Sequence, residues 1–292
     1  MLSKELKQTI VKAVLKHREN FSGSDTKFAV YLGINPAQYN RLKKGETENL
    51  LSEAKWMGIA RRCDVPLKGE KVWQTASTPV YNYIMAQLTY CQENATNGIF
   101  CDKADIGKSY AAKVYVRNHS NSALIDCSQV KSKQKLVRAI AREFGVDHTG
   151  RYHDVYADVV YYLKSIDNPL IILDEAGDLD YGAFLELKAL WNATENHCAW
   201  YMMGADGLSK KIERGIEGRK VGFTEIFSRY GSRFQHLVPK GTDSTKDFIH
   251  TQASLIIEAN ASGKVDVNDL IRKTSGSLRR IYVELTKIRR AG

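Results

Sequence analysis

The chain has 292 residues, 43% of them hydrophobic, which is enough for two or three domains with a buried core. A formal net charge of +10 suits a polyanionic partner such as DNA, although many ordinary basic proteins carry as much. Five scattered cysteines without a C-x-x-C pair argue against disulfide and zinc frameworks. No apolar run approaches the ~18 residues of a membrane span. We therefore expect a soluble cytoplasmic protein with no membrane partner.

Residues 1–67 are expected to form a small helical domain. Gly33 ends one helix in a tight turn, and Asn35 is a good N-cap for a second helix that has Pro36 at its first position. Gly45 then closes this second helix. A short helix, a turn with glycine and a polar, basic second helix are typical of a helix-turn-helix of the phage-repressor type.

The start of the second helix is the part of such a motif that enters the major groove of DNA. Here it offers four candidate DNA contacts, Gln38, Asn40, Arg41 and Lys43. A domain of this size can bind protein instead, and both partners remain open. From Leu50 to Ala60 the apolar residues predict one further packing helix.

The remainder is expected to contain a linker and two subdomains. Residues 68–79 hold Gly, Ser, Thr and Pro and predict the linker. An α/β nucleotide-binding subdomain should follow over 80–241, and a helical subdomain over 242–292. Strands are expected at 98–101, 123–125, 170–173, 198–203 and 234–238. They alternate with helices, which predicts a parallel sheet covered by helices on both faces.

A phosphate-binding loop of the form G-x-x-x-x-G-K-[ST] is partly preserved after the first strand. The predicted nucleotide-binding residues are Ile106, Gly107, Lys108, Ser109 and Tyr110. In such a loop the backbone N–H groups surround the phosphates, the Lys reaches the β and γ oxygens, and the Ser hydroxyl binds Mg²⁺.

Two carboxylates distinguish this loop from the usual pattern. Asp102 stands where the first glycine belongs, and Asp105 lies three residues further on. Each carboxylate near a triphosphate costs about 1 kcal/mol of Coulomb energy when solvent screens it, so we expect weakened nucleotide binding.

Asp174 and Glu175 follow the apolar strand Leu170–Leu173. Asp174 would lie at the carboxyl edge of the sheet, where ligands bind in open α/β folds, and is assigned to Mg²⁺ through water. Glu175 is the candidate base that polarises the attacking water. The alternative is an acid pair that caps the next helix.

Together these segments resemble the AAA+ ATPases, specifically the transposition regulators of the phage Mu B type, to which IstB and TnsC are related. The most specific parts are the domain order, Ile226–Arg233 and Ser275–Arg280. The resemblance implies an α/β fold: an AAA+ P-loop core with a parallel sheet, an N-terminal helix-turn-helix domain and a C-terminal helical lid. ATP and Mg²⁺ are the implied cofactors.

The resemblance also implies roles for residues outside the two motifs. Arg229, or else Arg233, corresponds to the arginine finger that reaches the γ-phosphate of a neighbouring subunit. Arg279 corresponds to the sensor II arginine of the lid, with Arg280 as the alternative.

The family's sensor I position is altered in this chain. The family has a polar residue after Gly204, where this chain has Ala205. Asp206 either substitutes for that residue or N-caps the following helix.

Lys131, Lys133 and Arg151 correspond to the region that faces the DNA backbone in similar filament-forming ATPases. Contacts of this kind give salt-sensitive binding that does not depend on sequence. Alternatively, a basic helix begins at Lys131 and these side chains face solvent without contacting DNA.

The function implied by the resemblance is ATP-dependent, largely sequence-nonspecific binding of double-stranded DNA. The protein would form a homo-oligomer on DNA, a ring or a helical filament, and deliver target DNA to a DDE-type transposase. Hydrolysis would be slow and stimulated by DNA and transposase. Two alternatives stay open: a nucleotide-sensing DNA-binding regulator without efficient hydrolysis, and an ATPase of the helicase-loader or replication-initiator type.

Overall fold

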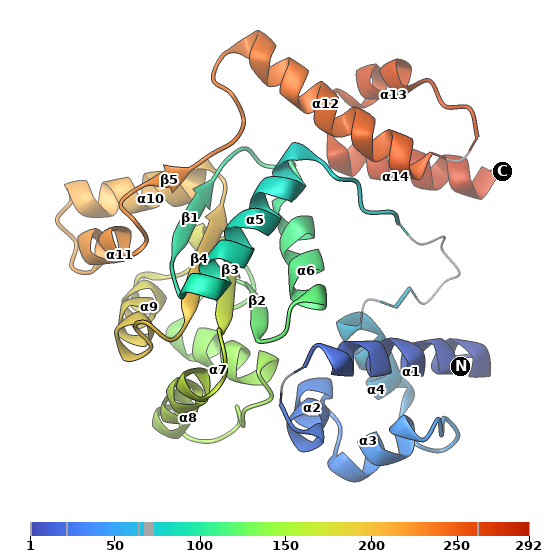
Figure 1. The fold of residues 1–292 in the computed structure, drawn as a ribbon, viewed down its shortest axis with the longest axis vertical. Coiled ribbons are helices and arrows are strands. Elements are labelled where there is room, and N and C mark those ends of the chain that lie inside the picture. The colour runs from blue at the N-terminus through green and yellow to red at the C-terminus, as the bar shows by residue number, and fades with distance from the viewer. Residues whose placement is uncertain (1, 22, 64, 67–72, 262, 292) are drawn as a thin grey trace.

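A computed structural model describes residues 2–21, 23–63, 65–66, 73–261 and 263–291, and Figure 1 shows its fold. The N-terminal part consists of four helices, α1 (Lys4–Glu19), α2 (Asp25–Leu32), α3 (Pro36–Lys43) and α4 (Glu53–Arg62). They enclose a core of their own in which Phe28, Tyr39 and Trp56 are fully buried. Within the described residues, no helix is both long and apolar enough to cross a membrane.

The turn between α2 and α3 has the predicted local chemistry. Gly33 ends α2 in the left-handed conformation at φ 74°, which costs glycine little. Asn35 caps α3, and its side chain forms a reciprocal capping box with Gln38. The expected helix from Leu50 is wrong at its start. Ser52 caps α4 through its side chain, so the helix begins at Glu53, and Leu50 packs into the core from the preceding turn.

The α/β part contains a five-stranded sheet in the order β2-β3-β4-β1-β5, in which each strand runs parallel to its neighbours. Its strands are β1 (Gly98–Cys101), β2 (Ser122–Asp126), β3 (Leu170–Asp174), β4 (Ala199–Gly204) and β5 (Phe234–Gln235). The helices of this part are α5 (Pro79–Asn94), α6 (Lys108–Asn118), α7 (Lys133–Glu143), α8 (Tyr152–Ser165), α9 (Tyr181–Ala193), α10 (Asp206–Glu217) and α11 (Phe223–Arg229), with the short 3-10 helix η1 (Ala176–Asp178). The predicted parallel sheet with helices on both faces is confirmed.

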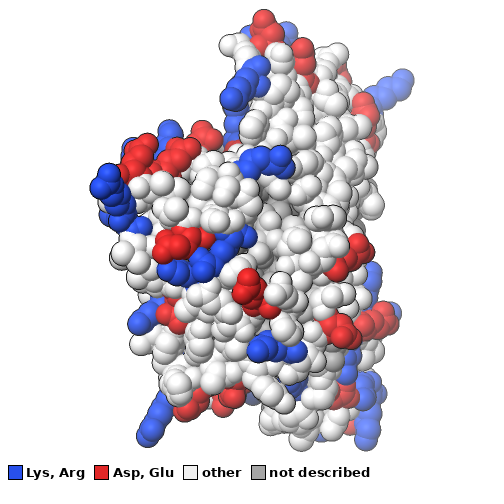
Figure 2. Space-filling view, turned by 60° about the vertical axis from the view of Figure 1, so that its left-hand side comes forward, with Lys and Arg blue, Asp and Glu red and all other residues white. Residues whose placement is uncertain are grey.

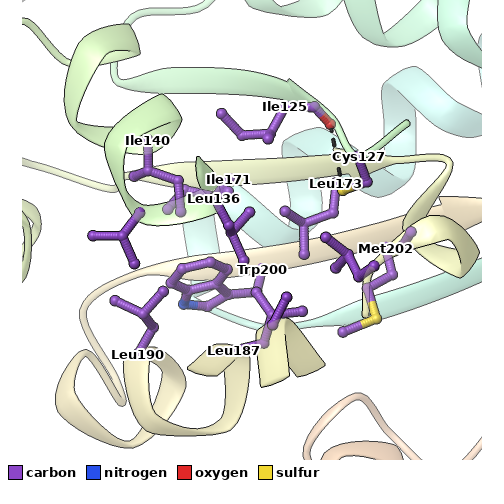
Figure 3. Close-up of a cluster of buried hydrophobic side chains, with 14 of the residues drawn as sticks. Ile125, Cys127, Leu136, Ile140, Ile171, Leu173, Leu187, Leu190, Trp200 and Met202 are labelled. Atoms are coloured by element: carbon purple, nitrogen blue, oxygen red, sulfur yellow. Dashed lines mark hydrogen bonds between the residues drawn. The ribbon is translucent and has the colours of Figure 1, made fainter. Parts of the chain in front are cut away.

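Each face of the sheet carries its own apolar layer, because successive strand residues point to opposite sides. Ile172 and Tyr201 pack with α5 and α6, whereas Ile171, Trp200 and Met202 pack with α7, α8 and α9. Figure 3 shows the second layer, where Trp200 and Met202 of β4 lie among leucines of α7 and α9. The two layers fix the sheet between its helices.

The last strand is much shorter than expected. β5 covers Phe234–Gln235 only, whereas the sequence pattern predicts 234–238. The backbone N–H groups of Leu237 and Val238 donate to Asp102 Oδ2, at 2.6 and 2.9 Å, instead of continuing the ladder. A side chain from another segment therefore ends this strand, and Pro239 follows it.

Three helices form the C-terminal subdomain, here called the lid: α12 (Thr242–Asn260), α13 (Val267–Thr274) and α14 (Leu278–Ala291). Ile257, Ile281 and Leu285 are the centre of its core. Of the predicted linker, residues 68–72 lie outside the described residues, as does residue 67 at the predicted domain boundary. Trp73 packs on Tyr282, with 4.9 Å between ring centroids, so the end of this linker lies on the lid.

The helical N-terminal part contacts the α/β part through polar groups. Asn20 Nδ2 donates to the carbonyl oxygen of Arg117 at 2.7 Å, and Arg62 lies 3.9 Å from Glu143 on α7. Burial raises the pKa of the Glu143 carboxyl, and the nearby Arg62 lowers it. These contacts join α1 and α4 to the core.

We expect Asp102→Ala to lower the free energy of unfolding by about 2–4 kcal/mol, because it leaves the N–H groups of Leu237 and Val238 without their acceptor. Asp102→Asn keeps one acceptor oxygen and should lose less. Urea unfolding followed by circular dichroism measures both. Equal stability of Asp102→Ala and wild type would contradict this role.

Candidate nucleotide-binding site

The parallel register brings the expected phosphate loop and the acid pair to one edge of the sheet. Cys101 of β1 pairs with Gly204 of β4, and β3, which ends at Asp174, lies on the other side of β4. Asp102 N donates to the carbonyl oxygen of Gly204 at 3.2 Å. The carboxyl ends of β1, β3 and β4 therefore surround one site, as open α/β sheets require.

The loop leads into α6 with no side chain capping that helix. Gly107 is the N-cap, in a left-handed conformation with φ 96°. The first N–H groups of a helix have no partner within the helix, so those of Lys108, Ser109 and Tyr110 face the loop. An uncapped helix start with aligned N–H groups binds phosphate. Ile106 is buried beneath the loop, and Tyr110 is exposed, with its hydroxyl 2.7 Å from Thr75 Oγ1.

Lys108 is the buried cation of the site, with only 6% of its surface exposed. Its ammonium donates to the carbonyl oxygens of Asp102, at 2.8 Å, and Lys103, at 2.5 Å. An ammonium has three donors, which leaves one for a phosphate oxygen. Burial lowers the pKa of Lys108, while the carboxylates of Asp102, Glu175 and Asp174 raise it. The predicted Lys and acid pair thus lie within electrostatic reach of each other.

Asp174 is 7% exposed at the end of β3, and Glu175 follows it in a left-handed conformation with φ 50°. This conformation is unfavourable for glutamate and marks a strained position. Burial and the neighbouring Asp174 raise the pKa of the Glu175 carboxyl, and Lys108 lowers it. The helix-capping alternative is wrong, because Glu175 makes no side-chain cap to η1 and Asp174 Oδ1 accepts from the N–H of Glu175.

The oxygen atoms of Ser109 and Asp174 are of the kind that Mg²⁺ binds. The described residues contain no cluster of three or more His, Cys, Asp or Glu side chains that would enclose a metal. Mg²⁺ does not need one, since it retains several waters and binds through one or two protein groups plus substrate phosphates. The hydroxyl of Ser109 and the carboxylate of Asp174 are the groups that would hold it.

The expected repulsion from Asp102 needs correction. Its carboxylate accepts from the N–H of Lys103, at 2.7 Å, and from those of Leu237 and Val238. These N–H groups partly offset the negative charge of the Asp102 carboxylate, whose residue is only 5% exposed. Asp102 therefore connects the phosphate loop to the segment after β5, and does not lie as a free charge against the phosphates.

Asp105 connects the same loop to the lid. Its carboxylate accepts from Ser277 Oγ at 2.6 Å and from Arg279 N at 3.2 Å. The side chain of Arg279, at the first turn of α14, lies 3.7 Å from the same carboxylate. Arg280 instead donates to the carbonyl oxygen of Lys273 within the lid. Of the two sensor II candidates, Arg279 is thus the one beside the phosphate loop.

The sensor I position holds no polar side chain. Ala205 is the N-cap of α10 without a side-chain hydrogen bond. Asp206 is the first residue of the helix, so the expectation that it N-caps α10 is wrong. Its exposed carboxylate lies in the first turn, where a helix favours negative charge.

The two candidate arginine fingers lie at the opposite end of the sheet from the phosphate loop. Arg229 ends α11 and Arg233 precedes β5, which pairs in parallel with β1 from Ile99 onward. Arg229 stacks over Trp191 at 4.8 Å, and its Nε is buried without a hydrogen-bond partner among the described residues. Arg233 is exposed. Neither faces the nucleotide site of its own chain, and Arg233 is the more accessible to another subunit.

Most of the predicted DNA contacts of the N-terminal domain already have partners in the chain. Arg41 pairs with Glu46, and Lys43 pairs with Asp25, each at 2.7 Å. Gln38 belongs to the capping box of α3, whereas Asn40 is exposed. The structure describes the two helices and their turn, and DNA binding by α3 stays a prediction.

The predicted DNA contacts of the core lie on one surface beside α7. Lys131 and Lys133 are exposed, 3.7 Å from Asp178 and 5.9 Å from the ring of Tyr152 respectively. Arg151 is exposed directly before α8. The predicted helix start at 131 is wrong, because Ser132 occupies the N-cap position and α7 begins at Lys133.

Sequence reasoning missed one aromatic residue on this surface. Tyr181, at the start of α9, lines a shallow groove together with Lys133 and a second one with Lys210 and Arg214 of α10. No motif marks it. Elsewhere, on the face drawn in Figure 2, basic and acidic side chains lie next to each other without a broad area of one sign.

A family model described as "AAA domain" matches residues 92–212, which run from the end of α5 into α10. The chain contains an AAA domain. The match includes the phosphate loop and the acid pair, and it implies that the chain binds ATP. It concerns AAA domains in general, so the Mu B type remains a proposal.

The other comparisons add little. No curated protein matches the chain. Among solved structures, the Orc1 protein of Aeropyrum pernix in complex with DNA is similar, with 14% identity and a TM-score of 0.47. The match covers 74% of this chain and 66% of that one, just under two thirds of its length. A likeness of this extent carries no conclusion about function.

We expect Lys108→Ala to weaken the binding of a fluorescent ATP analogue tenfold to hundredfold, because a charged hydrogen bond contributes about 1.5–3 kcal/mol. Titration at equilibrium measures the dissociation constant. Lys113→Ala, on the exposed side of the same helix, is the matched control and should bind as wild type does. Unchanged affinity of Lys108→Ala would contradict the assigned site.

Proposed function

We propose that this chain is an AAA+ ATPase whose binding to double-stranded DNA depends on ATP and is largely independent of sequence. It would oligomerise on the DNA and deliver target DNA to a DDE-type transposase. The observation that carries the proposal is the separation of two half-sites within one chain. Lys108, Asp174 and Glu175 lie at one edge of the sheet, and Arg229 and Arg233 lie at the other. Two copies placed head to tail complete one site, which makes oligomerisation a condition for catalysis.

The residues of the chain divide the chemistry between them. Ser109 and Asp174 would hold Mg²⁺, which would neutralise part of the negative charge of the phosphates. Lys108 binds the phosphate oxygens, and Glu175 holds and polarises the attacking water at its carboxylate. Arg233 or Arg229 of the next subunit donates to the γ-phosphate, an interaction that in related systems raises the rate by about 10³–10⁵.

DNA binding is assigned to the basic surface of the core and to the N-terminal domain. Lys131 and Lys133 are exposed at the start of α7, Arg151 is exposed directly before α8, and the chain carries a net charge of +10. Such side chains contact phosphates without reading bases. Tyr181, between the grooves, adds an apolar surface for the sugar-phosphate chain. The transposase partner rests on the resemblance alone.

The non-hydrolysing switch is the second candidate, and Ala205 at the sensor I position favours it. Both candidates predict ATP-dependent DNA binding. They differ in turnover, because only the ATPase releases phosphate.

We expect ATP to increase both the affinity for random-sequence duplex and the size of the oligomer, since nucleotide joins the two half-sites. Fluorescence anisotropy and light scattering with duplex measure these quantities. Phosphate release in the presence of DNA should be abolished by Glu175→Gln, which keeps nucleotide binding. No release from wild type would favour the switch, and no effect of ATP on either affinity or size would refute the proposed function.

The double variant Lys131→Ala/Lys133→Ala should weaken duplex binding and lower the slope of log affinity against log salt by about 2, since each phosphate contact contributes about 0.9. The matched control is Lys113→Ala/Lys164→Ala, which removes two exposed lysines elsewhere. If both double variants behave alike, these lysines are not phosphate contacts.

A further inference from the structure

The phosphate loop and the lid are joined by one carboxylate, that of Asp105. One oxygen accepts from Ser277 Oγ at 2.6 Å, and the other accepts from Arg279 N at 3.2 Å and lies 3.7 Å from Arg279 Nε. Ser277 Oγ also accepts from Arg280 N at 3.3 Å. The start of α14 is therefore capped by its own serine and by a side chain from a loop more than 170 residues earlier.

The backbone on both sides of this contact is constrained. Asp105 has φ 61°, a left-handed conformation that aspartate tolerates better than most residues. On the lid side, Gly276 has φ 69°, and a Cβ there would lie 2.5 Å from Ile249. Leu278 lies over Gly107, 3.9 Å from the position that a Cβ would take. Two defined turns thus meet at the Asp105 carboxylate.

Asp105 lies at a position on the lid that favours an anion. A helix start attracts negative charge, and the guanidinium of Arg279 strengthens that preference. The phosphates of a bound nucleotide would lie against the neighbouring N–H groups of α6, which begins three residues after Asp105. Those phosphates repel the Asp105 carboxylate and attract Arg279. Carboxylate and nucleotide therefore compete for the same lid residues.

We propose that Asp105 is a latch that holds the lid on the phosphate loop, and that nucleotide binding releases the latch by drawing Arg279 from Asp105 to the phosphates. Asp105 is a positioning residue and does not contact the reacting atoms. This inference rests on the proposed nucleotide binding. The latch would give the altered loop sequence a function, because Asp105, which weakens nucleotide binding, would also couple that binding to the position of the lid.

Hydrogen exchange of α14, with nucleotide absent, tests the latch itself. Asp105→Ala and Ser277→Ala should each speed exchange at residues 278–281 at least threefold, and Asp247→Ala, an exposed lid aspartate, should not. Ser277→Ala leaves the phosphate loop intact, so the test survives if Asp105→Ala folds poorly. Unchanged exchange in both variants would overturn the latch.

Titration with a fluorescent ATP analogue tests the competition. Removal of the charge in Asp105→Ala should tighten binding about fivefold, the equivalent of about 1 kcal/mol of screened repulsion. Ser277→Ala should tighten it less, because the carboxylate stays. Equal or weaker binding by Asp105→Ala would overturn the competition. If wild type itself binds no nucleotide, the proposed function and the release step fail, and the exchange measurement alone decides whether the latch exists.

Discussion

The parallel register of β1, β3 and β4 is the constraint on which the site depends. Each strand contributes the residues at and just beyond its carboxyl end, so one edge receives the phosphate loop, the Asp174–Glu175 pair and Gly204. The buried apolar layers on both faces hold this register, since a slip by one residue would turn Trp200 and Met202 to the wrong side. Lys108 can be buried among carbonyls and carboxylates only because these ends meet.

The two aspartates of the phosphate loop show how a departure from a motif can become part of the fold. Asp102 ties the loop to the segment after β5, and Asp105 ties it to α14. Both lie in the loop of the candidate nucleotide site, but these hydrogen-bond partners are more than 130 residues away in the sequence. The loop is thus connected to the rest of the chain in two directions, through the carboxylates of Asp102 and Asp105.

Local sequence chemistry was sufficient for much of this structure. The strand 98–101, the start of α3 and the turn from β1 into α6 all follow from patterns a few residues long, and each is found as predicted. The failures have a tertiary cause. β5 ends early because Asp102, over 130 residues away, takes its N–H groups. The stacking of Arg229 on Trp191 and the role of Asp105 depend on packing that no local pattern encodes.

The shortness of β5 has a consequence for assembly. An outer strand normally offers a row of unpaired N–H and C=O groups on which another chain can add a strand. Here the pairing with β1 spans two residues, and the next N–H groups are already occupied by a carboxylate. This border of the sheet is a poor template for strand addition. In the proposed assembly on DNA, where copies of the chain would lie close together, this border would not join sheets, and contacts made here between copies would run through side chains.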